Sequence, residues 1–306
     1  MKLHVKFRLM GSLAMGAVLA AGGVGVAGAA PAEKTNDVVS HSIPQTQVSA
    51  AADYWTSARM KAATPKDIKI DKKGKVRTTA GKRAPIVTPT ATLQTPVKHI
   101  GKVFFTLSGG NYVCSANAVV STNKNTVVTA GHCLNEGAGA WATRFTFVPA
   151  YENGAAPYGK WSATRLFAPQ QWSASGDISY DTAFARVASP TGRSLTDTVG
   201  ASPVSFNQAR GLNYTAFGYP AAAPFNGETL QSCTGRATAD PFGQSQSQGI
   251  PCDMTGGSSS GPWFIGTSSA GTQNSVNSFG YDGVPNRMFG PYWGTVIRNV
   301  YTQAAA

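Results

Sequence analysis

Short runs of apolar and β-branched residues recur from about Pro96 to the C-terminus, and Gly, Asn or Pro separates them. Each run has the length of a β-strand, and no convincing helical pattern lies between them. Many short strands at regular intervals favour an antiparallel β-barrel or sandwich, and about 210 residues would suit two small barrels. The expected strands are 100–107, 112–120, 126–130, 142–149, 181–187, 213–218, 261–266, 275–280 and 294–300.

The segment before Pro96 lacks this pattern. Residues 30–50 are expected to be disordered, and residues 53–63 to form a short helix that Pro65 stops. A lone helix has no core of its own. It would dock on the downstream domain as a propeptide element, or be a remnant without function. The residues expected to share one side of this helix are Tyr54, Trp55, Ala58 and Ala62.

The positive charge of the chain is concentrated in this first third. The net charge is +12, of which residues 1–95 carry +9 and residues 96–306 only +3. A basic stretch could bind nucleic acid or an anionic surface. A solvated, protease-accessible linker is the more frequent case and is the interpretation favoured here, with no nucleic-acid partner. The basic residues are Lys66, Lys69, Lys72, Lys73, Lys75, Arg77, Lys82 and Arg83.

The N-terminus has the pattern of a secretory signal peptide. Basic residues precede an apolar stretch over 10–28, and the small residues Ala27-Gly28-Ala29 suit cleavage after Ala29. A membrane anchor is the alternative, because the apolar stretch is close to spanning length. We expect a signal peptide at 1–29, a propeptide or basic linker at 30–95, and a domain at 96–306. The product would be extracellular, without stable membrane association.

Four cysteines fit an exported protein. Cys114 and Cys133 are 19 residues apart, and so are Cys233 and Cys252. Three pairings are possible, and the local one would close two loops worth about 3 kcal/mol each in the chain-entropy model. Zinc binding is a weak alternative, because no spacing resembles a CxxC ligand pair.

Two segments together indicate a nucleophile and its base. His132, in Thr129-Ala130-Gly131-His132-Cys133, is the only histidine after His99, and a histidine at a strand end can move protons near neutral pH. Ser259 is central in Gly257-Ser258-Ser259-Ser260-Gly261, a run followed by a buried-strand pattern rather than by more linker. The N–H groups of Gly257 and Ser259 could stabilise an oxyanion. Ser258 and Ser260 remain alternatives as nucleophile.

An orienting carboxylate completes the constellation. Asp181 begins a strand-like run, and Asp177 is its rival. The order along the chain then distinguishes the fold families. No histidine follows Ser259, which excludes an α/β-hydrolase order. A subtilisin-like order would need an acid before His132, where acids occur only in the propeptide and linker segments. The order His132, Asp181, Ser259 is that of chymotrypsin-like enzymes.

In these motifs the sequence resembles the trypsin/chymotrypsin superfamily of serine peptidases, and most closely its secreted bacterial branch, which includes glutamyl endopeptidases. The likeness covers about 96–306 and implies two antiparallel six-stranded β-barrels with the active site between them. It implies a disulfide between Cys114 and Cys133 that braces the histidine loop. It also implies that an extended substrate pairs along Ser278-Phe279-Gly280 by β-augmentation.

Three departures from the family pattern concern activation and specificity. Ser258 stands where typical trypsins carry the acid that pairs with a new N-terminal ammonium, so activation needs another device. Ser260 replaces the usual glycine after the nucleophile. Asp253, six residues before Ser259, suggests cleavage after Arg or Lys, although some relatives with other preferences carry an acid there. Asn277, which we also expect to contact the substrate, replaces the histidine of glutamyl endopeptidases, and this makes a strict preference for Glu less favoured.

The sequence thus predicts a secreted serine endopeptidase, made as a zymogen and monomeric, that cleaves protein or peptide substrates without a cofactor or metal. A catalytically silent homologue that binds proteins or surfaces is the alternative, because fold alone never proves activity.

Overall fold

A six-stranded antiparallel barrel forms the first half of the domain. The computed structural model describes residues 37–71, 73–79 and 90–306, so the predicted signal peptide and the Lys82-Arg83 pair lie outside it. The strands follow one another in the order β10-β11-β8-β7-β6-β9, and β9 pairs back with β10 to close the barrel. Their bounds are β6 Ile100–Leu107, β7 Gly110–Val119, β8 Thr126–Thr129, β9 Thr143–Pro149, β10 Trp161–Pro169 and β11 Ala183–Val187.

Every residue of β6 is buried, because both faces of this strand are covered. Val103, Phe105 and Leu107 pack into the barrel core, whereas Ile100 and Phe104 join a second apolar cluster that also contains Trp55. The barrel therefore has a packed outer face as well as a packed interior.

The second half of the domain consists of two sheets. The first has the strand order β17-β16-β12-β13-β5, and the second has the order β14-β15-β19-β18-β3-β4. A disulfide between Cys233 and Cys252 joins β13 to the segment that follows β15. The bounds are β5 Thr92–Leu93, β12 Asn213–Gly218, β13 Gln231–Arg236, β14 Thr238–Ala239, β15 Gln248–Pro251, β16 Pro262–Ile265, β17 Gln273–Val276, β18 Phe279–Tyr281 and β19 Arg287–Gly290, with β3 Asp67–Ile70 and β4 Val76–Thr79 added from the N-terminal segment. The fold is thus mostly β and chymotrypsin-like, with one closed barrel and further sheets.

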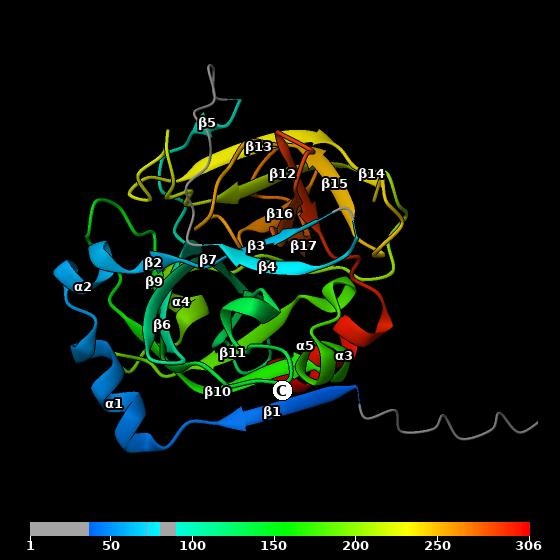
Figure 1. Cartoon of the computed structure of the whole chain (residues 1–306). Helices are drawn as coiled ribbons and strands as arrows, with labels where there is room; N and C mark the ends of the chain where they lie inside the picture. Colours follow the sequence, from blue (N-terminus) through cyan, green and yellow to red (C-terminus); the bar gives the residue numbers. More distant parts are fainter. Residues whose placement is uncertain (1–36, 72, 80–89) are drawn as a thin grey trace, which may run out of the picture. The chain divides into compact units, whose positions relative to one another are not determined.

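The segment before Thr79 is built into both halves. β1 (Val38–Ser42) pairs antiparallel with β10, β2 (Thr64–Pro65) pairs with β7, and β3 pairs with β18. In Figure 1 the blue strand β1 runs beside β10, and the cyan strands β3 and β4 lie between the two halves. The expectation of disorder is wrong for 37–50, which contains β1 and the start of a helix, and a solvated linker is wrong for 66–70, which contains β3.

Two helices replace the single predicted one. α1 (Gln45–Tyr54) and α2 (Ser57–Ala62) meet at Trp55, which is fully buried and donates its indole N–H to the Arg144 carbonyl at 2.7 Å. Ala58 and Ala62, expected on the buried side, are exposed. The segment docks on the domain, as a propeptide element would, through Val48, Ala51, Trp55, Met60 and Ala63.

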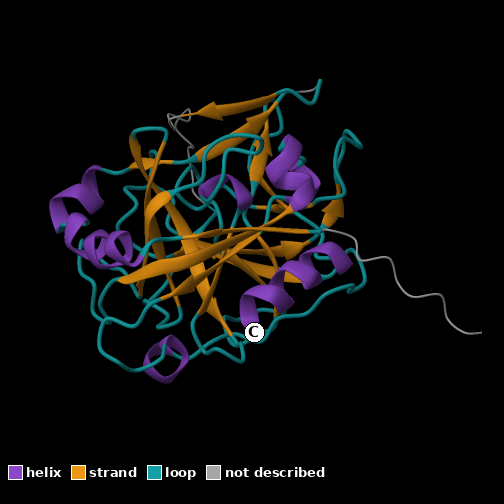
Figure 2. Ribbon diagram, turned by 90° about the horizontal axis from the view of Figure 1, so that it is seen from below, coloured by secondary structure: helices purple, strands orange, loops and turns teal. Residues whose placement is uncertain are grey.

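The remaining helices are α3 (Gln170–Ser175), α4 (Leu195–Val199) and α5 (Thr295–Ala305), and Figure 2 shows helices around the outside of the strands. The prediction of a strand at 294–300 is wrong, because Ile297, Val300 and Ala304 of α5 are buried at helical spacing. In the described part of the chain no helix is long and apolar enough to cross a membrane.

Candidate active site

The β8–β11 pair brings the predicted base and its orienting acid together. His132 lies in a 3-10 turn, η1 (Gly131–Cys133), just after β8, and Asp181 lies just before β11. The two strands pair in the antiparallel sense, with Thr129 opposite Ala183. The end of one strand therefore lies beside the start of the other, and both side chains meet there.

Asp181 holds the imidazole at two points. Its Oδ2 lies 2.8 Å from His132 Nδ1, and its Oδ1 accepts the backbone N–H of His132 at 2.8 Å. Asp181 is fully buried, and the Ser278 hydroxyl donates to its Oδ2 at 2.5 Å. An ionised carboxylate in this position favours the tautomer in which Nδ1 carries the proton, which leaves Nε2 to accept one.

The rival acid has a different place. Asp177 is exposed and caps a short turn, η2 (Ile178–Tyr180), by accepting the N–H of Ser179.

The Nε2 atom of His132 is buried and makes no hydrogen bond to any described residue. The pair His132–Asp181 therefore has one basic nitrogen left for a reacting group.

The Ser259 loop is hydrogen-bonded to the end of β8, just before the turn that carries His132. The Ser260 hydroxyl oxygen accepts hydrogen bonds from the Ala130 N–H at 2.7 Å and from the Thr129 hydroxyl at 2.9 Å. Ser259 directly precedes Ser260, and His132 lies two residues after Ala130, so both lie close to this contact. Ser260 adopts a left-handed φ of +73°. The serine found in place of the usual glycine supplies a hydroxyl that joins the two loops.

Two backbone N–H groups of the Ser259 loop have no hydrogen-bond partner among the described residues. Gly257 has a φ of +96°, and a Cβ there would lie 2.7 Å from the Tyr219 carbonyl, so only glycine fits. The N–H groups of Ser258, Ser260 and Gly261 donate within the structure. Those of Gly257 and Ser259 donate to no described residue. These two remain available for a ligand oxygen.

Two residues whose positioning roles the sequence did not reveal hold this loop. Asn277, predicted to contact substrate, donates through Nδ2 to the carbonyls of Phe217 and Ser258, and its Oδ1 accepts from Trp263. Its side chain is therefore fully used inside the protein. Ser115, fully buried in β7, donates to the Gly257 carbonyl. A hydroxyl within the apolar run 112–120 was the available signal.

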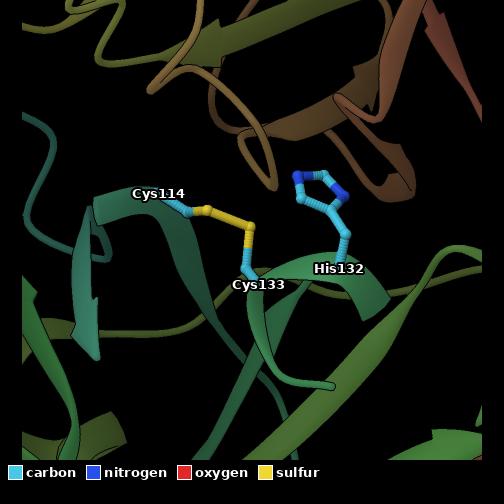
Figure 3. Close-up of side chains that lie close together, drawn as sticks. All are labelled: Cys114, His132 and Cys133. Atoms are coloured by element: carbon cyan, nitrogen blue, oxygen red, sulfur yellow. A yellow bond between two sulfur atoms is a disulfide. The ribbon is translucent and has the colours of Figure 1, made fainter. Parts of the chain in front are cut away.

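The histidine turn is also braced by a disulfide, as Figure 3 shows for Cys114, Cys133 and His132. The Cys114–Cys133 bond is 2.03 Å long, and Cys233 pairs with Cys252, so the local pairing is confirmed. Ligand atoms of Cys114, His132 and Cys133 lie within 4.8 Å of one another, as in a metal site. Disulfide sulfurs are not thiolates, however, and Nδ1 is held by Asp181, so this donor set does not fit a metal.

Asp253 is fully buried at the predicted specificity position. Its Oδ2 accepts the N–H of Thr90 at 2.5 Å, and its Oδ1 accepts the N–H of Ala91 at 2.8 Å. The predicted preference for Arg or Lys stays a prediction, and in this structure the chain's own backbone binds the carboxylate.

The N-terminal segment covers the site. β3 pairs in the parallel sense with β18, so that Ile68 lies opposite Phe279 and Lys69 opposite Gly280, on the strand where substrate was expected. A Cβ on Gly256 would lie 3.0 Å from the Asp67 Cβ, so Asp67 lies directly against the segment that leads to Gly257. A cavity of about 300 Å³ beside His132 has Lys66, Ile68 and Val76 in its wall.

Lys66 fixes the start of β3. It is largely buried, its Nζ lies 3.8 Å from Glu136 Oε1, and it stacks on the Tyr112 ring at 4.5 Å. Burial lowers the pKa of the Lys66 ammonium, while the Glu136 carboxylate opposes that shift. The segment is therefore anchored by charge as well as by Ile68 and Ile70.

A closed barrel followed by a second β half, with a His–Asp pair at the end of two barrel strands, defines a chymotrypsin-like protein. Two solved structures support this class at high identity. The protease Anisep from Arthrobacter nicotinovorans is 63% identical, with a TM-score of 0.68, over 70% of this chain and 99% of that one. The thermostable serine protease AL20 from an extremophilic microorganism is 53% identical, with a TM-score of 0.66, over 68% of this chain and 97% of that one.

This chain belongs to the trypsin/chymotrypsin-like superfamily of serine peptidases. A Glu endopeptidase structure shares the fold at 17% identity and a TM-score of 0.57, over 72% of this chain and 99% of its own. No family model matches the sequence.

One curated relative has a name from another class. An extracellular metalloprotease of Bacillus subtilis (strain 168) is 29% identical over 140 residues, which are 44% of this chain and 40% of that protein. The chain therefore matches less than half the length of this relative. The donor set around His132 does not fit the metal that the name implies.

Proposed function

We propose that the chain is the precursor of a secreted serine endopeptidase that cuts peptide bonds through His132, Asp181 and Ser259. The His132–Asp181 pair, with Nδ1 held at 2.8 Å and Nε2 without a partner among the described residues, carries the proposal. Residues 1–29 would be the signal peptide, and the segment up to about residue 95 the prosegment. Disulfides are typical of extracellular proteins. The similarity to proteases supports a protein or peptide as the substrate.

The acylation step begins with proton transfer from the Ser259 hydroxyl to His132 Nε2. The Ser259 oxygen then bonds to the carbonyl carbon of the scissile peptide, and the carbonyl electron pair moves to its oxygen. As that pair returns, the C–N bond breaks and the imidazolium gives its proton to the leaving amine. Water then repeats the sequence and releases the acid product. Asp181 stays ionised throughout and stabilises the imidazolium.

The N–H groups of Gly257 and Ser259 would bind the developing oxyanion. Such donors are effective because they are already oriented, and Ser115 and Asn277 fix the loop that carries them. Removal of one oxyanion donor typically lowers kcat by about 10²–10³-fold.

The prosegment would keep this site inactive. β3 pairs with the edge of β18 that β19 leaves open, so an extended substrate has no strand edge to pair with. β3 runs parallel to β18, and a parallel pair has a different hydrogen-bond pattern from an antiparallel pair. The segment would thus block the site. The side chain of Asp67, rather than a peptide carbonyl, lies against Gly256.

A fluorophosphonate probe tests the function. We expect the processed secreted protein to be labelled, and Ser259→Ala to abolish labelling, whereas Ser258→Ala remains labelled. An unlabelled processed protein, or equal labelling of Ser259→Ala, would favour the silent homologue.

A peptide of residues 64–79 tests the inhibition. It should inhibit the processed enzyme and remain uncut within 67–70, whereas a peptide of the reversed sequence should not inhibit. Rapid cleavage of the native peptide within 67–70 would contradict the proposed mode of binding.

A further inference from the structure

The carboxylate of Asp253 is bound by the chain at Thr90 and Ala91. Both of its oxygens accept backbone N–H groups, at 2.5 Å from Thr90 and 2.8 Å from Ala91. Directly afterwards, Thr92–Leu93 form β5 and pair with β13. This contact therefore lies where the chain enters the second half of the domain.

Within 37–71, 73–79 and 90–306, no cation lies in an ion pair with this carboxylate. Asp253 is fully buried, and no Lys, Arg or His of the described residues forms an ion pair with it. Burial of a carboxylate is costly unless a positive charge balances it. Neutral amide groups supply hydrogen bonds but no charge. A cation at this site would balance a charge that none of the described residues balances.

The usual position for an activating ion pair is neutral in this chain. Ser258, directly before the proposed nucleophile, is buried and donates its hydroxyl to the Thr255 carbonyl at 2.7 Å. It cannot hold an ammonium group as a carboxylate would. Asp253 lies five residues earlier on the same segment, which continues through Gly256 to Gly257.

We infer that Asp253 receives the N-terminal ammonium of a mature chain that begins at Thr90. The inference rests on the proposed function and deepens it. The Thr90 nitrogen already lies 2.5 Å from Oδ2, so cutting the bond before Thr90 creates the ion pair without moving the segment. The amide nitrogen becomes an ammonium with three N–H donors, and the buried carboxylate gains its counter-charge.

The lengths of the solved relatives support this start. Anisep and AL20 align over 99% and 97% of their own chains, but over only 70% and 68% of this one. Residues 90–306 make up a similar fraction of this chain.

The same ion pair changes the role expected for Asp253 in substrate specificity. With its charge balanced by the Thr90 ammonium, the Asp253 carboxylate offers no net negative charge to the cationic side chain of a substrate. Asp253 is then a positioning residue of the oxyanion segment, and cleavage does not require Arg or Lys before the scissile bond.

The mature N-terminus and the pH profile test this inference. Intact mass of the purified active enzyme should give a chain that starts at Thr90. Its activity should fall at alkaline pH as the ammonium loses its proton, because an α-amino group has an ordinary pKa near 8 and pairing with Asp253 raises it. A first residue upstream of Thr90, or an activity without an alkaline fall, would overturn the inference.

Variants at Asp253 separate it from substrate recognition. Asp253→Asn should lower kcat at least tenfold and move the alkaline fall to lower pH, while a mixed peptide library gives an unchanged residue preference; Asp253→Glu should restore most of the activity. Asp240→Asn, a second buried carboxylate that accepts the Tyr281 hydroxyl, is the matched control and should leave the alkaline fall in place. A preference for Arg or Lys that disappears in Asp253→Asn would overturn the inference in favour of a substrate-binding carboxylate.

Labelling at Ser259 keeps the two proposals apart. A wild-type enzyme that reacts with fluorophosphonate but starts elsewhere refutes the role of Asp253 alone, whereas the absence of Ser259-dependent labelling refutes the peptidase. If Asp253→Asn does not accumulate, the wild-type N-terminus and pH profile still decide.

Discussion

The hydroxyl oxygen of Ser260 accepts a hydrogen bond from the Ala130 N–H at 2.7 Å, which links the residue after the proposed nucleophile to the residue two before the proposed base. Ser260→Ala leaves the buried Ala130 N–H and Thr129 hydroxyl without this acceptor, at a cost of about 1–3 kcal/mol. It should also lower kcat with little change in KM.

Ser260→Gly is the matched variant. It loses the same hydrogen bonds but relieves the left-handed φ of +73°, so it should be about 1 kcal/mol more stable than Ser260→Ala. Urea unfolding of both variants measures the difference. Greater stability of the alanine variant would show that φ strain is unimportant at this position.

Asp181→Asn should lower kcat of the processed enzyme by about 10⁴-fold, the loss known when the orienting carboxylate of such a triad becomes an amide. Ser278→Ala removes only a hydrogen bond to this carboxylate and should cost about ten- to a hundredfold. Steady-state kinetics of the two variants on one peptide substrate give the comparison. Equal losses would mean that Ser278, not charge, controls the imidazole.

Activity of the processed enzyme should rise between about pH 5 and pH 8, because the imidazole accepts a proton only when it is neutral. The single-turnover rate on an ester or peptide substrate measures this rise. A flat profile over the same range would contradict the role of His132.

Lys102 should make stability depend on pH. Its Nζ is buried, donates to the Gly227 carbonyl at 2.8 Å and lies over the Tyr151 ring at 4.2 Å. Burial lowers the pKa of Lys102 to about 8, against the opposing attraction of Glu228. The folded-state value is below the unfolded one, so the unfolded chain binds more protons between these values. The free energy of unfolding should therefore rise from about pH 8 to pH 10, by at most about 1.4 kcal/mol per pH unit.

Lys102→Met supplies the control for this effect. Its stability should lose the rise between about pH 8 and pH 10, since an apolar side chain cannot titrate. Chemical denaturation at fixed pH values measures both proteins. An unchanged slope in the variant would assign the rise to another group.

The double variant Cys114→Ser/Cys133→Ser should lose about 3 kcal/mol of stability, as expected for opening a loop of this length. Because Cys133 adjoins His132, kcat should fall as well. Cys233→Ser/Cys252→Ser opens a loop of equal length away from the histidine and should lose stability with a smaller change in kcat. Equal changes in kcat would show that the first bond has no special link to the base.

Strands in both halves of the domain could be predicted because their own residues alternate or are wholly apolar. The strands expected at 100–107 and 213–218 coincide with β6 and β12. The segment 294–300 misled because Val296, Ile297 and Val300 are β-branched, whereas Ile297, Val300 and Ala304 follow the period of a helix. Packing of this helix against the barrel outweighs the local β-strand propensity of these residues.

The N-terminal segment was hidden for a physical reason. It has few large apolar residues, and those it has are buried only by strands far away in the sequence, as for Trp55 against Phe104. The candidate site was more accessible to sequence reasoning, because His132, Asp181 and Ser259 lie in distinctive motifs. The Asn277 amide and both Asp253 oxygens are hydrogen-bonded to other parts of the chain. These are tertiary contacts, which the spacing of residues along the sequence does not reveal.

Strand β18 pairs with β19 on one side and with β3 on the other. Release of β3 turns β18 into an edge strand whose row of N–H and C=O groups is open to any extended chain. The groups that would align a substrate would then also align an exposed strand of a second copy. The protein without its β3 would therefore be more prone to self-association and self-digestion as its concentration rises.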